Sequence, residues 1–454
     1  MYLLTGFYGL FLACLSQGFA QSNAREIDAA NLISASQAGA MPLYFDVNDP
    51  GIPLIKQSNR QYAGEFYIRN GLQNFFTRAK RGDSLKVGFI GGSITRADHQ
   101  YRTQTAKFLQ SLFPRAKMTG LNAGISGTGS DLGACRVYEQ LLVHKPDLIF
   151  IEFAVNGAFA PGIEGIIRQI RKFDRSTEIC LIYTIGSGQA EMYSKGEVPN
   201  AVKKLELLAS HYGLPSVHLG ASIGFLQSED CLAWKGDPGT EKQRIVFSLD
   251  GLHPTKEGGT LYAAAISRAF IAMKAASKSG MVEHDLPVAL LDDNWEDAKM
   301  LEPRKYASFD KNWKDIDPLS TKNINEFRPW FPYVIKGEKA GASFNFEFTG
   351  NMFGLFDIGG PEVGQLLITI DGKQMNSNRF NKYCNNRYRG QYITFKVPEG
   401  KHVVRVEIDS QIPDKKIILG ENQLSDIEKN PGKYNQSAIY IGKILIKGTP
   451  LNRL

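Results

Sequence analysis

Four short segments of the sequence carry residue types that could do chemistry together. In the first, residues 87–95, two glycines end an apolar run and Ser93 follows them directly. Glycines permit a tight turn, and a serine at such a turn can act as a nucleophile when a base lies within reach. The segment is not a G-x-S-x-G elbow, because Thr95 stands at the second glycine position. A structural turn whose serine caps a helix is the alternative interpretation.

A candidate base lies later in the chain, where Asp250 precedes His253 by three residues. A carboxylate at that spacing can hold the Nδ1–H of the ring across one turn and leave Nε2 free to accept a proton. The alternative is an ordinary loop aspartate and a surface histidine ahead of a helix that Pro254 starts. None of the other histidines has a comparable neighbourhood in the sequence.

Two further loops could supply hydrogen-bond donors to an anion. Residues 122–130 carry glycines in the order G-x-x-G-x-G, which is not the dinucleotide fingerprint, and they would expose backbone N–H groups. Asn156 ends another apolar run and could project its amide N–H into the same crevice, which suits oxyanion stabilisation. Taken alone, the first loop could be a plain connection, and Asn156 with Gly157 could be a plain turn.

The elements that must position these segments alternate between strands and helices from residue 81 to residue 280. We predict strands at residues 86–91, 118–121, 147–153, 178–185 and 215–219. We predict helices at residues 103–113, 131–144, 162–173, 201–212 and 256–275. Continuous apolar strands with helical crossovers indicate an α/β domain whose parallel sheet is covered on both faces. The serine, glycine and asparagine segments each follow a strand, at the edge where such a sheet places its ligand.

The last part of the chain, residues 285–454, shows a different pattern. We predict short alternating strands at residues 343–348, 366–371, 392–397, 402–408 and 438–446, with turns at 371–372 and 398–400 and no helices between the strands. Strands at this spacing indicate an all-β sandwich, similar to a jelly roll. An irregular segment at residues 292–333 either wraps the first domain or begins the sandwich. Residues 21–80 form an N-terminal extension with one predicted helix near its end, at residues 70–80.

Three tryptophans lie after the α/β region, at positions 295, 313 and 330. Their rings could stack on sugars, but a place in the core is the favoured interpretation. The composition of the whole chain, 43% hydrophobic and 22% charged over 454 residues, excludes a disordered chain and a coiled coil. The formal charge of +7 is mild, and no basic run or motif predicts binding to nucleic acid.

The first twenty residues carry no charge, are too short to span a bilayer comfortably and end in Gly18 and Ala20 at the −3 and −1 positions. This pattern predicts a signal peptide at residues 1–20, cleaved before Gln21, and a secreted or periplasmic protein. Lipid anchoring at Cys14 is the disfavoured alternative, because Phe11 replaces the usual leucine three residues earlier. No later apolar stretch is long enough for stable membrane insertion.

Four cysteines follow the predicted signal, at positions 135, 180, 231 and 384. The sequence does not choose among their three possible disulfide pairings. Cys180 lies within an apolar run, where a buried free thiol is the favoured state. No Cys/His cluster at metal spacing occurs, so we expect neither a metal nor a cofactor.

The order of the four segments resembles that of the SGNH (GDSL-like) hydrolase superfamily. This resemblance implies a flavodoxin-like three-layer α/β/α domain at residues 81–280, with Ser93 as nucleophile and His253 as base, oriented by Asp250. It also implies an oxyanion hole made by the N–H groups of Ser93 and Gly127 and the side chain of Asn156. Gly127 is chosen because the family pattern Asn-x-x-x-x-Gly begins at Asn122. Two positions depart from the family, Gly92 and Gly157, where aspartate is common.

With its predicted export signal and its companion sandwich, the chain is similar to secreted bacterial carbohydrate esterases. The resemblance therefore implies an esterase that removes O-acetyl groups from polysaccharide through an acyl-enzyme, with an acetylated glycan or a small acyl ester as its partner. A broad-specificity lipase or arylesterase is one alternative. An O-acyltransferase and a catalytically inactive carbohydrate-binding protein are two more. The glycan, the acyl group, the role of the sandwich and the oligomeric state stay open.

Overall fold

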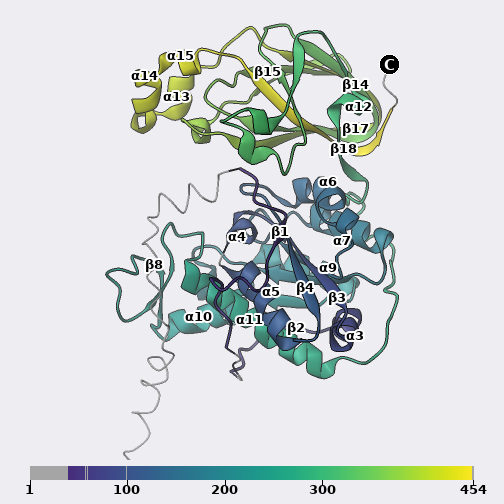
Figure 1. The fold of residues 1–454 in the computed structure, drawn as a ribbon, viewed down its shortest axis with the longest axis vertical. Helices are drawn as coiled ribbons and strands as arrows, with labels where there is room; N and C mark the ends of the chain where they lie inside the picture. The colour runs from purple at the N-terminus through teal and green to yellow at the C-terminus, as the bar shows by residue number, and fades with distance from the viewer. Residues whose placement is uncertain (1–38, 57, 59, 99, 452–454) are drawn as a thin grey trace, which may run out of the picture.

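A computed structural model describes residues 39–451 of the chain except 57, 59 and 99. The predicted signal peptide and Cys14 lie outside these described residues. The chain forms two bodies, one above the other, with an α/β sheet in the lower body and an antiparallel sheet in the upper (Figure 1). The predicted fold class, an α/β domain followed by an all-β sandwich, is therefore confirmed.

Within the described part of the chain, the lower sheet has seven strands in the order β1-β4-β3-β5-β6-β7-β2. Its five central strands are parallel: β3 (Ser84–Gly91), β4 (Lys117–Gly124), β5 (Leu148–Glu152), β6 (Glu178–Tyr183) and β7 (Ser216–His218). Numbered along the chain, these five lie in the order 2-1-3-4-5, the arrangement of flavodoxin-like folds. The order reverses at β3, so the crevice at the carboxyl ends of β3 and its neighbours is the expected ligand site.

The described part of the N-terminal extension covers both edges of this sheet. Strand β1 (Tyr44–Phe45) pairs antiparallel with β4, and β2 (Phe66–Tyr67) pairs antiparallel with β7. An uncovered edge would present unpaired backbone groups to other chains, and these short strands remove that hazard. The extension then leads into α3 (Gln73–Arg81), the helix predicted at residues 70–80.

Helices cover both faces of the sheet and complete three layers. One face carries α6 (Ser130–Gln140), α7 (Ala160–Phe173) and α9 (Asn200–His211), whose apolar side chains share one buried cluster with the strands. The other face carries α3, α5 (Tyr101–Leu112), α10 (Gly220–Ser228) and α11 (Lys256–Ala276). Because both faces are covered, β5 and β6 are buried along their whole length, which is why they are almost continuously apolar. The sequence did not predict α8 (Gln189–Ser194) or the parallel pair β8 (Leu232–Lys235) and β9 (Ile245–Ser248).

The upper body is built on a nine-stranded sheet whose ladders are all antiparallel. Its main path is β12 (Trp313–Ile316), β13 (Val334–Gly337), β18 (Ile439–Pro450), β14 (Ser343–Gly359), β17 (Arg389–Ile408), β15 (Gln365–Ile370) and β16 (Lys373–Asn378). Strand β10 (Ala298–Leu301) pairs with β18, and β11 (Ser308–Phe309) pairs with β14. The irregular segment at residues 292–333 thus begins this sheet.

Two details of the predicted sandwich were wrong. Residues 392–397 and 402–408 belong to the single strand β17, and residues 398–400 are no turn. They form a bulge, since Gly350 pairs with Gly400 while Met352 pairs with Lys396. Pro398 is tolerated at this bulge, because its missing N–H removes no hydrogen bond from the pairing of the two strands. Short helices also occur, α13 (Lys415–Leu419), α14 (Ser425–Lys429) and α15 (Pro431–Tyr434), where none was predicted. The turn at residues 371–372 is confirmed as the two-residue β15–β16 hairpin.

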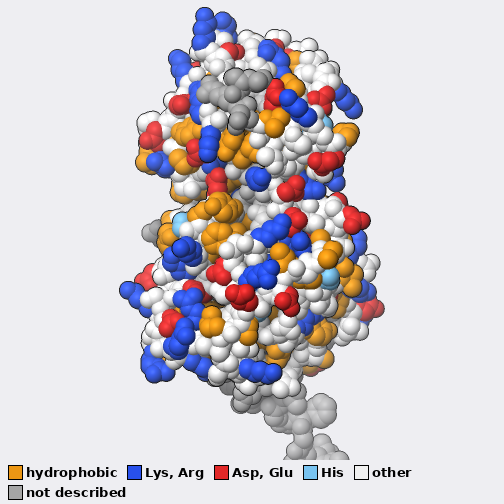
Figure 2. Space-filling model, turned by 90° about the vertical axis from the view of Figure 1, so that its right-hand side faces the viewer, with side chains coloured by type: hydrophobic (Ala, Val, Ile, Leu, Met, Phe, Trp, Pro, Cys, Tyr) orange, Lys and Arg blue, Asp and Glu red, His pale blue; other side chains and the backbone are white. Residues whose placement is uncertain are grey.

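The tryptophans mostly fill the core. Trp295 and Trp313 are 5% and 4% exposed, and Trp330 is half-buried. Cys135, Cys180 and Cys384 are buried thiols that form no disulfide with another described cysteine, as favoured for Cys180. No helix within the described residues is both long and apolar enough to cross a bilayer. Figure 2 shows lysine and arginine side chains interspersed with acidic ones over one face of the molecule, without a continuous basic area.

Candidate active site

Ser93, His253 and Asp250 form one hydrogen-bonded chain. The Ser93 Oγ lies 2.7 Å from Nε2 of His253, and Nδ1 of the same ring lies 2.6 Å from Oδ2 of Asp250. Ser93 is 8% exposed, and the His253 and Asp250 side chains are 14% and 11% exposed. The three residue types and their connections are those needed to activate a serine hydroxyl as a nucleophile.

The Asp250 carboxylate is held by its own loop. Its Oδ1 accepts hydrogen bonds from the backbone N–H groups of Leu252 and His253 at 2.9 and 2.8 Å, and from the Ser248 hydroxyl at 3.0 Å. Burial raises the pKa of Asp250, but these bonds and the His253 ring outweigh it, so the pKa lies well below its usual range. Asp250 therefore stays ionised and can keep the ring of His253 in one orientation.

Ser93 is placed by the end of β3 and the short helix α4 (Ser93–Arg96) that follows it. Beneath this turn lies Glu152, the last residue of β5, which is fully buried. Its carboxylate accepts hydrogen bonds from the Thr95 hydroxyl at 2.8 Å and the Thr184 hydroxyl at 2.5 Å. Burial raises the pKa of Glu152, while these two hydroxyls and the Gly92 N–H lower it, and the net shift is upward. Glu152 thus ties β5 and β6 to the residues on both sides of Ser93.

The structure brings Gly127 and Asn156 together at the same edge of the sheet. Gly127 has φ of +69°, a left-handed conformation that glycine adopts without strain. Gly127 and Asn156 both line a cavity of about 490 Å³, which we call the cleft. Asn156 also lies against Gly92, where a Cβ would overlap its amide group. A residue with a Cβ at position 92 would therefore displace the Asn156 side chain from the place it has in this structure.

The antiparallel sheet supplies the opposite wall of the cleft. Tyr392, Thr394 and Lys396 of β17 line it, together with Phe159 and Trp295. The sequence did not predict that strand β17 meets the glycine loop, because a contact between residues 263 positions apart, such as Gly129 and Tyr392, leaves no local pattern. Ser248, Glu152 and Tyr392 are therefore additions to the predicted site. Of these three residues, only Glu152 could have been recognised in the sequence, because it is an acidic residue at the end of an apolar strand.

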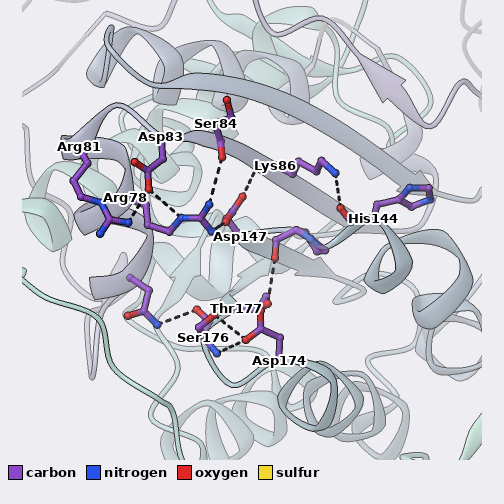
Figure 3. Close-up of polar contacts among 12 residues, drawn as sticks. Arg78, Arg81, Asp83, Ser84, Lys86, His144, Asp147, Asp174, Ser176 and Thr177 are labelled. Atoms are coloured by element: carbon purple, nitrogen blue, oxygen red, sulfur yellow. Dashed lines mark hydrogen bonds and ion pairs between the residues drawn. The ribbon is translucent and has the colours of Figure 1, made fainter.

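A second cavity, of about 380 Å³, lies at the opposite end of the parallel strands (Figure 3). Here Arg78 forms an ion pair with Asp147, whose other oxygen accepts the Lys86 N–H at 2.6 Å. The Lys86 Nζ donates to the carbonyl of His144 at 2.8 Å. These three charged groups are therefore engaged with one another and with the backbone. Within residues 39–451, as far as described, no three His, Cys, Asp or Glu side chains gather where they could hold a metal ion.

Comparison with solved structures identifies proteins that share this fold. Two structures of a two-domain esterase active on acetylated mannans, one co-crystallised with mannopentaose, align with TM-scores of 0.64 and 0.63 at 20% identity. They cover 87% and 86% of this chain and 100% and 99% of their own. An acetylxylan esterase from Geobacillus stearothermophilus aligns over 42% of this chain and 96% of its own, at 21% identity and a TM-score of 0.32. No protein-family model and no curated protein matches the sequence. The first two alignments extend over both bodies and show that the chain has the two-part fold of that esterase.

Proposed function

We propose that this protein is a serine esterase that removes acetyl groups from a polysaccharide through an acyl-enzyme, as the resemblance to SGNH hydrolases implies. The observation that carries this proposal is the unbroken chain from the Ser93 Oγ to His253 and on to Asp250, at 2.7 and 2.6 Å. Hydroxyl, imidazole and carboxylate in that order serve acyl transfer at neutral pH on several unrelated folds.

Each group has a defined task in this mechanism. His253 Nε2 takes the proton of Ser93 as its Oγ attacks the ester carbonyl, and Asp250 stabilises the imidazolium that forms. The N–H groups of Ser93 and Gly127 and the amide of Asn156 stabilise the oxyanion. The imidazolium then protonates the leaving sugar oxygen. In the second half, His253 takes a proton from water, the water attacks the acetyl group, and acetate leaves as Ser93 regains its proton.

The choice of an acetylated glycan rests on the fold and on the cleft. The structural neighbour that shares both bodies is active on acetylated mannans. In this chain the cleft is lined by loops that follow strands β4 and β5 and by strand β17 of the antiparallel sheet. A bound polymer would therefore contact the antiparallel sheet while its ester reaches Ser93. We also propose that residues 1–20 direct export, which would bring the enzyme to polysaccharides outside the cytoplasm. In this proposal residues 81–280 are the hydrolase domain and residues 285–454 are the sandwich domain.

The test is acetate release from acetylated mannan and xylan by the purified protein. Ser93→Ala should lower kcat by about 10³-fold or more, because the nucleophile is lost. Ser194→Ala, on the exposed face of α8, is the matched control and should retain parental activity. Near-parental acetate release by a folded Ser93→Ala variant would contradict the proposal.

The alternatives give different results in the same assays. A lipase or arylesterase would prefer long acyl chains or aromatic esters to acetylated glycans. An O-acyltransferase would move acetyl groups to a sugar acceptor faster than to water. An inactive carbohydrate-binding protein would bind the glycan and release no acetate from any ester.

A further inference from the structure

An arginine of the antiparallel sheet reaches the proposed oxyanion loop. Arg389 is the first residue of β17, and a Cβ built on Gly127 would lie 3.0 Å from its Nη2. The guanidinium therefore covers Gly127, close to where the ester carbonyl would bind. No chemistry of the proposed mechanism uses this group.

The charge of Arg389 is not balanced by the protein around it. The side chain is half-buried, its Nε is buried without a hydrogen-bond partner, and it has no ion pair with a described residue. The one carboxylate among the groups that act on its pKa, Asp357, is already bound by Arg379 at 2.5 and 3.0 Å and by Gln391 at 3.1 Å. A guanidinium that is partly removed from water, with no anion beside it, is unfavourable, so the position favours a ligand that brings one.

The surroundings of Arg389 strengthen this argument. Its guanidinium lies 4.9 Å from the ring centroid of Tyr383, a side chain that is 44% exposed. A second cation, Lys396, lines the cleft on the same strand, 6.0 Å from the ring of Phe159, and no described carboxylate pairs with it. The one acid among the cleft residues, Asp131, accepts the Tyr392 hydroxyl on both of its oxygens, at 2.8 and 3.0 Å. The cleft itself thus offers one cation, Lys396, and one engaged carboxylate, and Arg389 adds a second cation beside the cleft residue Gly127.

We propose that the substrate is an acetylated polysaccharide that contains uronate sugars, and that Arg389 pairs with a carboxylate near the acetylated position. The inference rests on the proposed esterase function and names its substrate class. Arginine presents a planar fork that matches the two oxygens of a carboxylate, whereas neutral sugar hydroxyls leave its charge unbalanced. Lys396 adds attraction along the same wall, and Tyr383 offers an aromatic face to a sugar ring.

The experiment compares acetate release from acetylated oligogalacturonates with free carboxylates and from the same oligosaccharides with methyl-esterified carboxylates. The wild-type protein should prefer the charged form by about tenfold or more in kcat/KM, since a charge-assisted hydrogen bond is gained. This preference should fall as sodium chloride rises from about 20 to 500 mM, because salt screens the pair. Arg389→Gln should remove most of the preference, and Arg389→Lys should keep an intermediate part of it.

Arg405→Gln is the matched control. Arg405 lies on the same strand, is exposed and pairs with Glu407 at 2.8 Å, so its loss should leave the preference intact. Equal kcat/KM for the two substrate forms, or an undiminished preference in folded Arg389→Gln, would overturn the inference. Release of no acetate from either form or from acetylated mannan would instead overturn the proposed esterase function.

Discussion

The hydroxyl of Tyr392, on strand β17, donates to the Asp131 carboxylate in the first turn of helix α6, at 2.8 Å to one oxygen and 3.0 Å to the other. The same hydroxyl lies 3.4 Å from the Gly129 N–H as its acceptor. This contact joins the antiparallel sheet to the loop that presents Gly127. A residue from the upper body thus fixes the position of a loop that belongs to the proposed site in the lower body.

Replacing this tyrosine tests whether the contact matters for the whole molecule. Tyr392→Phe should lower the free energy of unfolding by about 1–2 kcal/mol, because the Asp131 carboxylate loses a partly buried donor. Acetate release from polymers should fall more than cleavage of a small acetyl ester, since only polymers extend along β17. Urea denaturation and the two assays measure these effects. Tyr138→Phe, at an exposed position of α6, is the control, and equal losses in both variants would refute a joining role.

We predict that replacing Asn156 lowers kcat and changes KM little. Asn156→Ala should lower kcat by about 10²–10³-fold, the usual cost of losing one oxyanion donor. Asn156→Asp should lose at least as much, because a carboxylate would repel the developing negative charge. Steady-state kinetics on a small acetyl ester measures both, and Asn376→Ala on the distant strand β16 is the control. A kcat near the parental value in Asn156→Ala would remove the residue from the mechanism.

The sequence predicts the parts of the site that depend either on a short spacing or on the strand that a segment follows. Asp250 and His253 are three residues apart, so one turn suffices to bring them together. Ser93, Gly127 and Asn156 each follow a parallel strand, and the carboxyl ends of neighbouring strands meet at one edge. The topology of the parallel sheet therefore indicates that these three segments lie together, which no single motif indicates.

The parts that the sequence missed depend on packing between distant segments. Tyr392 and Arg389 look like ordinary strand residues until β17 is placed over the glycine loop. Residues 398–400 look like a turn, and only the long pairing of β17 with β14 shows that they form a bulge within one strand. The local composition of these residues favours a turn, but pairing within the sheet buries more surface than a turn would, so the strand continues through them.

A pH-dependent contribution to stability is predicted at Glu206. Burial raises its pKa, but the His218 ring, the Ser216 hydroxyl and the Arg69 guanidinium outweigh this and lower the pKa to about 2. A lowered pKa stabilises the folded state above the unfolded value of about 4.5, and this contribution is lost as the pH falls from there toward 2. Glu206→Gln should therefore lower the free energy of unfolding at pH 7 by about 1–2 kcal/mol, since solvent screening reduces the full value of the shift.

The same variant should differ from the parent by less than half as much at pH 3, because the Glu206 carboxylate takes up a proton on unfolding at that pH. Urea denaturation at pH 7 and pH 3 measures both differences. Glu191→Gln is the control, because this exposed carboxylate pairs with Lys195 at the surface, where an ion pair contributes little. A difference that stays constant with pH would show that the ionised form of Glu206 is not favoured by folding.

Glu152 is predicted to be a positioning residue for Ser93. Its two oxygens accept hydrogen bonds from Thr95 and Thr184, so Glu152→Gln places an amide donor where one of these hydroxyl donors points. The turn at Gly92 and Ser93 should shift, which lowers kcat by about tenfold or more while KM changes little, because a small displacement of a reacting atom is costly. Thr184→Val removes one hydrogen bond and leaves the carboxylate in place, so its effect should be smaller. If Glu152→Gln lowers the unfolding midpoint but leaves kcat at the parental value, Glu152 supports the fold without positioning the nucleophile.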